Sequence, residues 1–369
     1  MEIVYPDYSN SLLNLASSIL KHYGAEYSHP SLKIFDKLLE KNYKNVVVLL
    51  LDGMGTFALN YHLDSESFLR KHYICDISSV FPATTTAATT SVCSGLAPAE
   101  HAWIGWCLYF KEMDKLVNIY PNTIKGTKIA AANYHVASTV LPYKDIISMI
   151  NETGNAKAYS VSPFGTNKVT NLDELFDETL RLCNQDGRKY IYAYCEEPDN
   201  TMHVAGSEAH DVTVILKDIN DRVERLCSKL KDTLVIVTAD HGHINTKYRI
   251  LSDYPKLIEM IERPPSLENR AAAFYVKQQY KEDFAEEFHK AFGEEFLLLS
   301  KQDIIEKKLF GYGNIHPRFE DFIGDYIAIS KADTGIAYSH YSSQDASNHA
   351  GMTKQEMIVP FIAIADQNS

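Results

Sequence analysis

Aspartates and histidines of the kind that bind divalent metals recur at four separate places in the chain. Each place is ordinary on its own, but together they supply three carboxylates and three imidazoles. Zinc uses such ligands in catalytic sites, where three protein ligands leave a position open for substrate. The set is therefore large enough for two metal ions with three protein ligands each. Its members are Asp52, Asp199 with His203, Asp240 with His241, and His349.

A threonine-rich segment between the first and second of these places offers a nucleophile. Residues 81–95 read FPATTTAATTSVCSG, in which Pro82 can end an extended stretch and the Thr/Ala run can begin a helix that stops near Gly95. A threonine hydroxyl at a helix N-terminus lies beside free backbone N–H groups, which attract anions. Metal coordination would acidify this hydroxyl and make it nucleophilic. Taken alone, a threonine-rich stretch is more often a helix cap or buried filler.

Apolar runs of strand length alternate with helical patterns along the chain. This alternation is typical of a doubly wound α/β fold, in which helices flank a mostly parallel sheet. Helical spacing of apolar residues also predicts an amphipathic helix near the N-terminus. The predicted strands are Val46–Leu51, Tyr190–Cys195, Leu234–Thr238 and Met357–Ala365, and the predicted helices are Asn171–Cys183 and Ser207–Leu230.

Three of the candidate carboxylates follow predicted strands closely. Asp52 comes directly after the first strand, Asp199 four residues after Cys195, and Asp240 two residues after Thr238. Ligands of such sheets bind beyond the carboxyl ends of the strands. We therefore expect the three carboxylates to meet at one edge of one sheet.

The segment 266–334 has a different character and is predicted to be an inserted α+β subdomain, a cap or lid. It contains the strand-like AAAFYV, the acidic helical stretch KEDFAEEFHKAF and a second short strand at Tyr326–Ile329. Residues 1–265 and 335–369 are expected to form the catalytic α/β core.

Composition narrows the class of protein. The net charge of -12 argues against binding nucleic-acid duplexes through bulk charge, and no apolar stretch reaches the roughly 20 residues of a membrane span. The N-terminal residues lack the basic and apolar regions of a signal peptide, and the six cysteines form no CxxC pair. We expect a cytoplasmic protein with reduced thiols and no membrane partner.

Five motifs, in order from about residue 45 to 351, resemble the alkaline phosphatase superfamily, and within it the nucleotide pyrophosphatase/phosphodiesterase (type I phosphodiesterase) family. They are VVVLLLDGMG, SVFPATTTAATTSVCSGLAPAEH, EEPDNTMHVAG, TADHGH and His349. The resemblance implies a hydrolase of phosphodiester or nucleotide pyrophosphate bonds with two zinc ions, manganese or another divalent ion being the alternative. It also implies a small phosphorylated substrate, nucleotide-like in kind.

The resemblance assigns a role to each candidate. The nucleophile falls on Thr85, with Thr84 and Thr86 as alternatives in the same run, and it would form a phosphothreonine-type intermediate. One zinc would be held by Asp52, Asp240, His241 and the nucleophile, and the other by Asp199, His203 and His349.

The substrate pocket is less sharply indicated. Nucleotide-hydrolysing members of the family often carry an asparagine shortly after the nucleophile to hold a phosphoryl oxygen, and this chain has Ala88 there. Trp103, Trp106 and Tyr109 could stack on a base or sugar, although core packing is at least as common a role for such residues. His243 could reach the site, but a structural role is the commoner one for a single histidine.

Other functions remain open at the level of sequence. A phosphomonoesterase or a phosphonate hydrolase of the same superfamily would use the same ligands, because these do not define the leaving group. A metal-binding relative without activity is a further alternative. A sulfatase is not indicated, because Cys93 lacks the Cys-x-Pro-x-Arg context of sulfatases.

Overall fold

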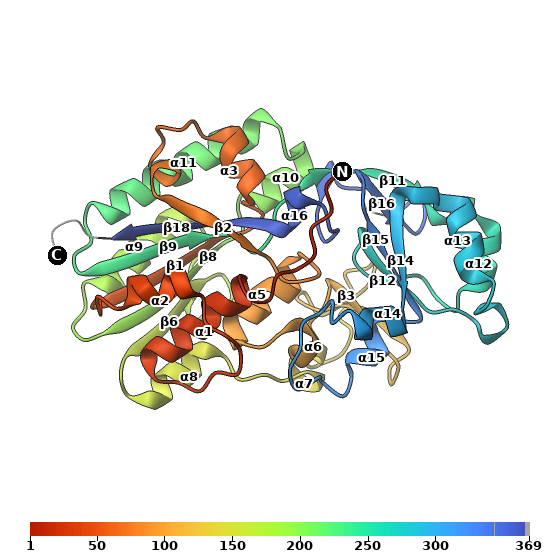
Figure 1. Cartoon of the computed structure of the whole chain (residues 1–369), viewed down its shortest axis with the longest axis horizontal. Helices are drawn as coiled ribbons and strands as arrows, with labels where there is room; N and C mark the ends of the chain where they lie inside the picture. Colours follow the sequence, from red (N-terminus) through yellow and green to blue (C-terminus); the bar gives the residue numbers. More distant parts are fainter. Residues whose placement is uncertain (343, 366–369) are drawn as a thin grey trace.

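The computed structural model describes residues 1–342 and 344–365 and is built around two sheets that lie side by side (Figure 1). The first sheet has seven strands, and its central strands β6, β8, β1 and β9 are parallel, whereas β18 runs antiparallel to β9 and β2. In spatial order its strands are β2 (Tyr73–Ser78), β18 (Ile358–Ala365), β9 (Thr233–Thr238), β1 (Asn45–Leu51), β8 (Lys189–Cys195), β6 (Lys157–Ser162) and β7 (Asn167–Lys168).

Helices cover both faces of this sheet, which confirms the predicted α/β class (Figure 1). All seven residues of β1 are buried, because a central parallel strand has helices on either side. Within the described ranges, no helix is both long and apolar enough to cross a membrane. The helices of this half are α1 (Leu12–Tyr23), α2 (Lys33–Leu39), α3 (Thr56–His62), α4 (Phe68–Lys71), α5 (Thr85–Ser94), α8 (Ile146–Thr153), α9 (Leu172–Cys183), α10 (Asp199–Ala205), α11 (His210–Cys227) and α16 (Lys354–Met357).

The predicted strands and helices of this half are present within a few residues of their expected bounds. The strand predicted at Met357–Ala365 is β18, which begins one residue later because Met357 ends α16. The helices predicted at Asn171–Cys183 and Ser207–Leu230 are α9 and α11, with Asn171 as the N-cap of α9.

The second sheet also has seven strands and is antiparallel throughout. This sheet extends beyond the segment 266–334, because it also includes β3, β4 and β5 from residues 107–124. These strands join it where Leu267 pairs with Cys107. These strands are two to four residues long, too short to show a strand pattern in the sequence. The division of the chain into core and lid stays a prediction. In spatial order the strands are β14 (Phe296–Ser300), β15 (Tyr326–Ser330), β13 (Ala271–Phe274), β12 (Ser266–Leu267), β3 (Cys107–Phe110), β4 (Lys115–Asn118) and β5 (Thr123–Ile124).

Two short two-stranded ladders are formed by the chain segments that connect the first sheet with the second. One is antiparallel and pairs Ile244 with Asn348; the other is parallel. Their strands are β10 (Ile244–Asn245) with β17 (Ser347–Asn348), and β11 (Lys247–Ile250) with β16 (Thr334–Ala337). The remaining helices belong with the second sheet and are α6 (Pro98–His101), α7 (Val136–Val140), α12 (Pro255–Met260), α13 (Phe284–Phe292), α14 (Lys301–Glu306) and α15 (Phe319–Phe322).

Candidate metal centre and nucleophile

Three adjacent parallel strands carry the candidate carboxylates to one edge of the first sheet. Asp52 follows β1, Asp199 is the first residue of α10 after β8, and Asp240 lies two residues beyond β9. Backbone contacts fix this edge, since the N–H of Asp52 donates to the Cys195 carbonyl (2.9 Å) and that of Asp199 to the Asp52 carbonyl (3.1 Å). The backbone thus places all three carboxylates at one edge of the sheet, as expected from the sequence.

Gly53 permits this close approach. Its φ of +74° is the left-handed conformation that favours glycine, and a Cβ here would lie 3.1 Å from the Cα of Asp199. Its N–H also donates to Oδ1 of Asp240 at 3.1 Å. One glycine therefore joins the ends of all three strands.

Three imidazole side chains gather around Asp199. His203 lies one helical turn further along α10, with Nε2 3.4 Å from Asp199 Oδ1, and the β10–β17 ladder brings His349 beside them, with Nε2 at 3.9 Å. His243 completes the group, with Nε2 2.5 Å from the same oxygen. The candidate ligand atoms of these four residues all lie within 4.8 Å of one another.

A second group contains Asp52, His241 and again Asp199. Nε2 of His241 lies 3.2 Å from Asp52 Oδ1 and 3.6 Å from Asp240 Oδ2. Asp240 uses Oδ1 to accept the backbone N–H groups of Gly53 and His241, whereas its Oδ2 is buried with no hydrogen-bond partner among the described residues. The residues predicted for both metal ions thus lie side by side, and Asp199 is shared by the two groups.

The threonine run places one hydroxyl against these groups. Thr85, the first residue of α5, has Oγ1 3.5 Å from Asp52 Oδ1 and 3.2 Å from His241 Nε2. Thr84 donates its hydroxyl elsewhere, to Glu268 at 2.7 Å, and the buried hydroxyl of Thr86 has no partner among the described residues. This geometry supports Thr85 as the nucleophile, which stays a prediction.

The charges of the centre are poorly compensated by protein groups alone. Burial raises the pKa of Asp52 and of Asp240 well above the usual range, and a neighbouring carboxylate reinforces this effect, Asp199 for Asp52 and Asp52 for Asp240. Burial would also raise the pKa of Asp199, but the neighbouring imidazoles outweigh it and lower this pKa. Burial and the other imidazoles hold the pKa of His349 well below its usual range.

This donor set fits divalent cations. A cation would compensate the closely spaced carboxylates and give the orphaned Oδ2 of Asp240 a partner. Oxygen and imidazole nitrogen donors together suit zinc or manganese.

His243 is a member of the centre that the sequence interpretation set aside as structural. Its Nδ1 lies 3.0 Å from the Ser347 hydroxyl, so both ring nitrogens are fixed. The sequence feature that indicates a role for His243 in the centre is its position two residues after His241 in the TADHGH motif.

The three tentative substrate residues lie in different surroundings. Trp103 is buried in the core beside the second sheet, where its Nε1 donates to the Leu141 carbonyl. Tyr109 has the Arg263 guanidinium 3.7 Å above its ring. Trp106 keeps 41% of its surface exposed, so among these three it offers the most accessible ring.

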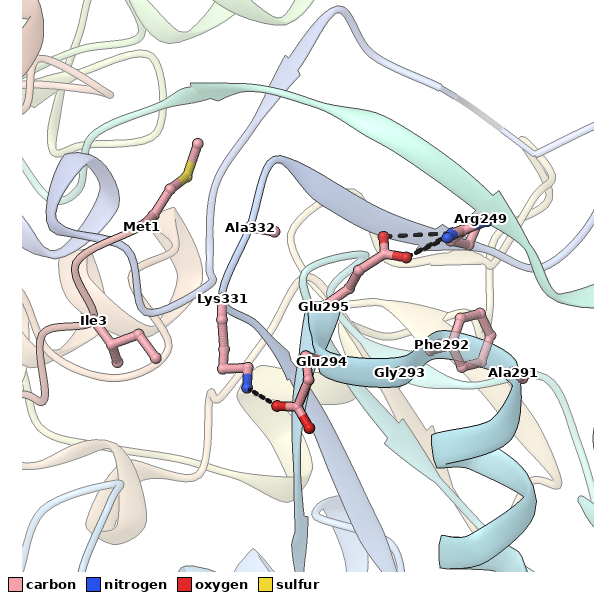
Figure 2. A pocket seen from close by; sticks show the side chains of 10 residues that line it. All are labelled: Met1, Ile3, Arg249, Ala291, Phe292, Gly293, Glu294, Glu295, Lys331 and Ala332. Atoms are coloured by element: carbon pink, nitrogen blue, oxygen red, sulfur yellow. Dashed lines mark hydrogen bonds and ion pairs between the residues drawn. The ribbon is translucent and has the colours of Figure 1, made fainter.

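A surface pocket elsewhere in the molecule is distinct from this centre. It is lined by Met1 and Ile3, the end of α13 and the turn after β15, with the ion pairs Arg249–Glu295 and Lys331–Glu294 across it (Figure 2). None of the predicted site residues lines it.

Comparison with known proteins identifies similar folds and a family. No curated protein matches the chain in sequence. Murine ectonucleotide pyrophosphatase/phosphodiesterase 5 has a similar structure, with a TM-score of 0.66 and 16% identity over 86% of this chain and 87% of that chain. An inactive threonine-to-alanine variant of that protein in complex with AMP gives a TM-score of 0.65 at 16% identity over the same shares. Phosphonoacetate hydrolase from Sinorhizobium meliloti 1021 gives 0.64 at 14% identity over 87% and 91%.

At these identities the structural likeness concerns the fold, and the family is shown by a match in sequence. The model of the type I phosphodiesterase / nucleotide pyrophosphatase family matches residues 46–353, which include all the motifs that carry the resemblance. The chain therefore belongs to the type I phosphodiesterase / nucleotide pyrophosphatase family of the alkaline phosphatase superfamily.

Proposed function

We propose that this protein is a metal-dependent hydrolase of phosphodiester or nucleotide pyrophosphate bonds with Thr85 as its nucleophile. The observation that carries the proposal is the hydroxyl of Thr85, held at the start of α5 and within 3.5 Å of Asp52 and His241. Membership of the family supports hydrolase activity on phosphoester bonds. A threonine-to-alanine substitution accompanies inactivity in the murine relative, which supports a threonine in this role.

Two zinc ions are the proposed cofactors, with manganese or another divalent ion as the alternative. Asp52, Asp240 and His241 would hold one ion, and Asp199, His203 and His349 the other, with His243 able to join the second set. Bound ions would neutralise charge on the phosphoryl oxygens and lower the pKa of the Thr85 hydroxyl.

In the proposed reaction Thr85 attacks phosphorus in line with the leaving oxygen. Its Oγ1 would lose its proton and form a bond to phosphorus as the bond to the leaving oxygen breaks, and the leaving oxygen would take up one proton in exchange. The first backbone N–H groups of α5 lie beside that hydroxyl and favour an anionic phosphoryl oxygen. Water would then hydrolyse the phosphothreonine ester and regenerate Thr85.

The proposed substrate is small, phosphorylated and nucleotide-like. The AMP complex of the murine relative supports this substrate class. The large negative charge of the chain weighs against a nucleic-acid duplex as substrate. We also propose a cytoplasmic location, in keeping with six free cysteines.

Hydrolysis of a phosphonate is a second candidate function. Ala88 is fully buried in α5 and has no donor where nucleotide-hydrolysing relatives often have an asparagine. The fold also resembles that of phosphonoacetate hydrolase nearly as closely as that of the murine relative, with TM-scores of 0.64 and 0.66.

A substrate panel on the zinc-loaded protein separates these functions. We expect kcat/KM for the p-nitrophenyl ester of thymidine 5′-phosphate to exceed that for p-nitrophenyl phosphate at least about a hundredfold, since a diester hydrolase binds both ester groups in the transition state. Faster hydrolysis of the monoester or of phosphonoacetate would contradict the diesterase assignment. Binding of zinc without turnover of any of these compounds would indicate an inactive relative.

A further inference from the structure

Glu268 brings a carboxylate from the second sheet to the residue beside the proposed nucleophile. It follows Leu267, the last residue of β12, which has a left-handed φ of +64°. A Cβ on Gly105 would lie 2.8 Å from the Cα of Leu267, so the two segments touch at the backbone. This strained and closely packed turn fixes where the carboxylate lies.

One oxygen of this carboxylate is fully engaged by the protein. Oε1 of Glu268 accepts the Thr84 hydroxyl at 2.7 Å and the backbone N–H of Trp106 at 2.6 Å. These bonds place Glu268 between the residue before Thr85 and the exposed ring of Trp106.

The other oxygen is free. Oε2 has no hydrogen-bond partner among the described residues. The Glu268 side chain is half-buried, and Oε2 is not among the fully buried polar atoms. Glu268 takes part in no ion pair among the described residues, and Lys125 instead donates its ammonium to the Pro265 carbonyl at 2.8 Å. Burial raises the pKa of Glu268, and the hydrogen bonds from Thr84 and Trp106, with the more distant charges of His241 and Lys125, offset only part of this effect.

An unpaired carboxylate beside a phosphoryl site has a defined chemical preference. An ionised carboxylate accepts hydrogen bonds and donates none, and it repels a further phosphate oxygen. A partly desolvated carboxylate without a partner also costs free energy, which a donor on a bound molecule would offset.

We propose that Glu268 is a specificity-determining residue that accepts a hydrogen bond from a hydroxyl or ammonium group on the alcohol part of the substrate, close to the phosphoryl group. This inference rests on the proposed function, because it places the phosphoryl group at Thr85. It predicts a preference for phosphoesters that carry such a donor over esters of plain alkyl alcohols.

Glu268→Gln tests the inference without removing the structural bonds. Its amide oxygen still accepts from Thr84 and Trp106, while the free position becomes an NH2 group that donates. Glu282→Gln is a matched control, because Glu282 has an exposed carboxylate and lies between β13 of the same sheet and α13.

Calorimetry on the zinc-loaded protein measures binding of ethyl phosphate, 3-hydroxypropyl phosphate and phosphoethanolamine. In the wild type we expect one or both donor-bearing ligands to bind at least about tenfold more tightly than ethyl phosphate, the effect of one charge-assisted hydrogen bond. Glu268→Gln should bring the ratio close to one, and Glu282→Gln should keep it. The two donor-bearing ligands distinguish a hydroxyl from an ammonium group.

Two outcomes would overturn the inference. One is a wild type with no preference for either donor-bearing ligand, and the other is a Glu268→Gln variant that keeps the preference or loses affinity for all three ligands equally. Turnover of the corresponding p-nitrophenyl diesters is measured in parallel. A wild type that shows the Glu268-dependent preference but hydrolyses none of the diesters contradicts the proposed function and leaves this inference supported.

Discussion

Three ligand side chains of the centre are each oriented by a second contact on the side away from the site. The Tyr194 hydroxyl donates to Oδ2 of Asp52, so that Oδ1 is the oxygen beside His241. Nδ1 of His203 and Nδ1 of His349 lie 3.0 and 3.2 Å from backbone carbonyl groups, which leaves their Nε2 atoms toward Asp199. Such outer contacts fix ring orientation and ligand basicity in metal sites.

Tyr194→Phe removes one of these contacts and no ligand. We expect zinc affinity to fall about 10- to 100-fold, because Asp52 loses the donor that orients it. Competition with a chromogenic chelator measures this affinity. Tyr23→Phe is the matched control, since Tyr23 is also buried and donates its hydroxyl to the carbonyl of Lys189, which begins β8 at the end opposite Asp199. Equal zinc affinity in both variants would show that Tyr194 does not position Asp52.

At the scale of single residues, the sequence indicates the ligands better than their neighbours. The acidic ligands follow long apolar strands, so their meeting at one edge is predictable. Glu268 carries no such signal, because its place depends on the pairing of β12 with β3, two strands far apart in the chain. His243 lies in a recognisable motif, but spacing alone does not distinguish a histidine of the centre from a structural one.

At the scale of elements, a buried ion pair ties the turn after His349 to the second sheet. Arg270 donates to both carboxylate oxygens of Glu356, at 2.6 and 2.8 Å, and Glu356 also accepts the Gly351 backbone N–H. The Glu356 carbonyl accepts the Gly242 N–H, and a Cβ on Gly242 would lie 2.0 Å from the neighbouring backbone oxygen of this turn. The turn therefore packs directly against the backbone of the segment that contains His241.

Arg270→Met should destabilise the fold by about 3–5 kcal/mol, because it leaves the Glu356 carboxylate buried and unpaired. Urea denaturation at neutral pH measures this loss. Arg249→Met, which removes a largely exposed ion pair with Glu295, is the control and should cost at most about 1 kcal/mol. Losses of equal size in the two variants would contradict a special role for the buried pair.

The same pair gives a dependence on pH with a defined sign. Burial alone would raise the pKa of Glu356, but Arg270 outweighs it and the pKa is lowered. The pair therefore contributes stability above the unfolded-state pKa of Glu356 and loses it as pH falls through the lower folded-state pKa. The stability difference between wild type and Arg270→Met should accordingly shrink in acid.

Element length decides what the sequence could predict. The strands β1, β8 and β9 have six or seven residues with apolar runs, and their predicted bounds agree with the structure to within one residue. The two-residue strands β10 and β17 show no pattern, yet their pairing sets His349 beside His243. The short strands β3, β4 and β5 were missed for the same reason, and with them the full width of the second sheet.

At the scale of the whole molecule, the centre lies at the edge of the first sheet and receives residues from the second. The central parallel strands supply carboxylates, α5 supplies the proposed nucleophile, and the turn after β12 supplies Glu268. The chain is strongly acidic, so attraction of an anionic substrate depends on local positive charge. Bound divalent ions would provide that charge within a centre whose own carboxylates are negative.

Turnover by Thr85→Ala, measured together with its metal content, tests the central claim most directly. With the p-nitrophenyl ester of thymidine 5′-phosphate as substrate, we predict a fall in kcat of at least about a thousandfold, because the attacking oxygen is lost. Zinc content should stay near that of the wild type, since the carboxylates and imidazoles are unchanged. Thr85→Ser, which keeps a hydroxyl, should retain measurable turnover. Wild-type turnover by a zinc-loaded Thr85→Ala variant would contradict the assignment of Thr85 as the nucleophile.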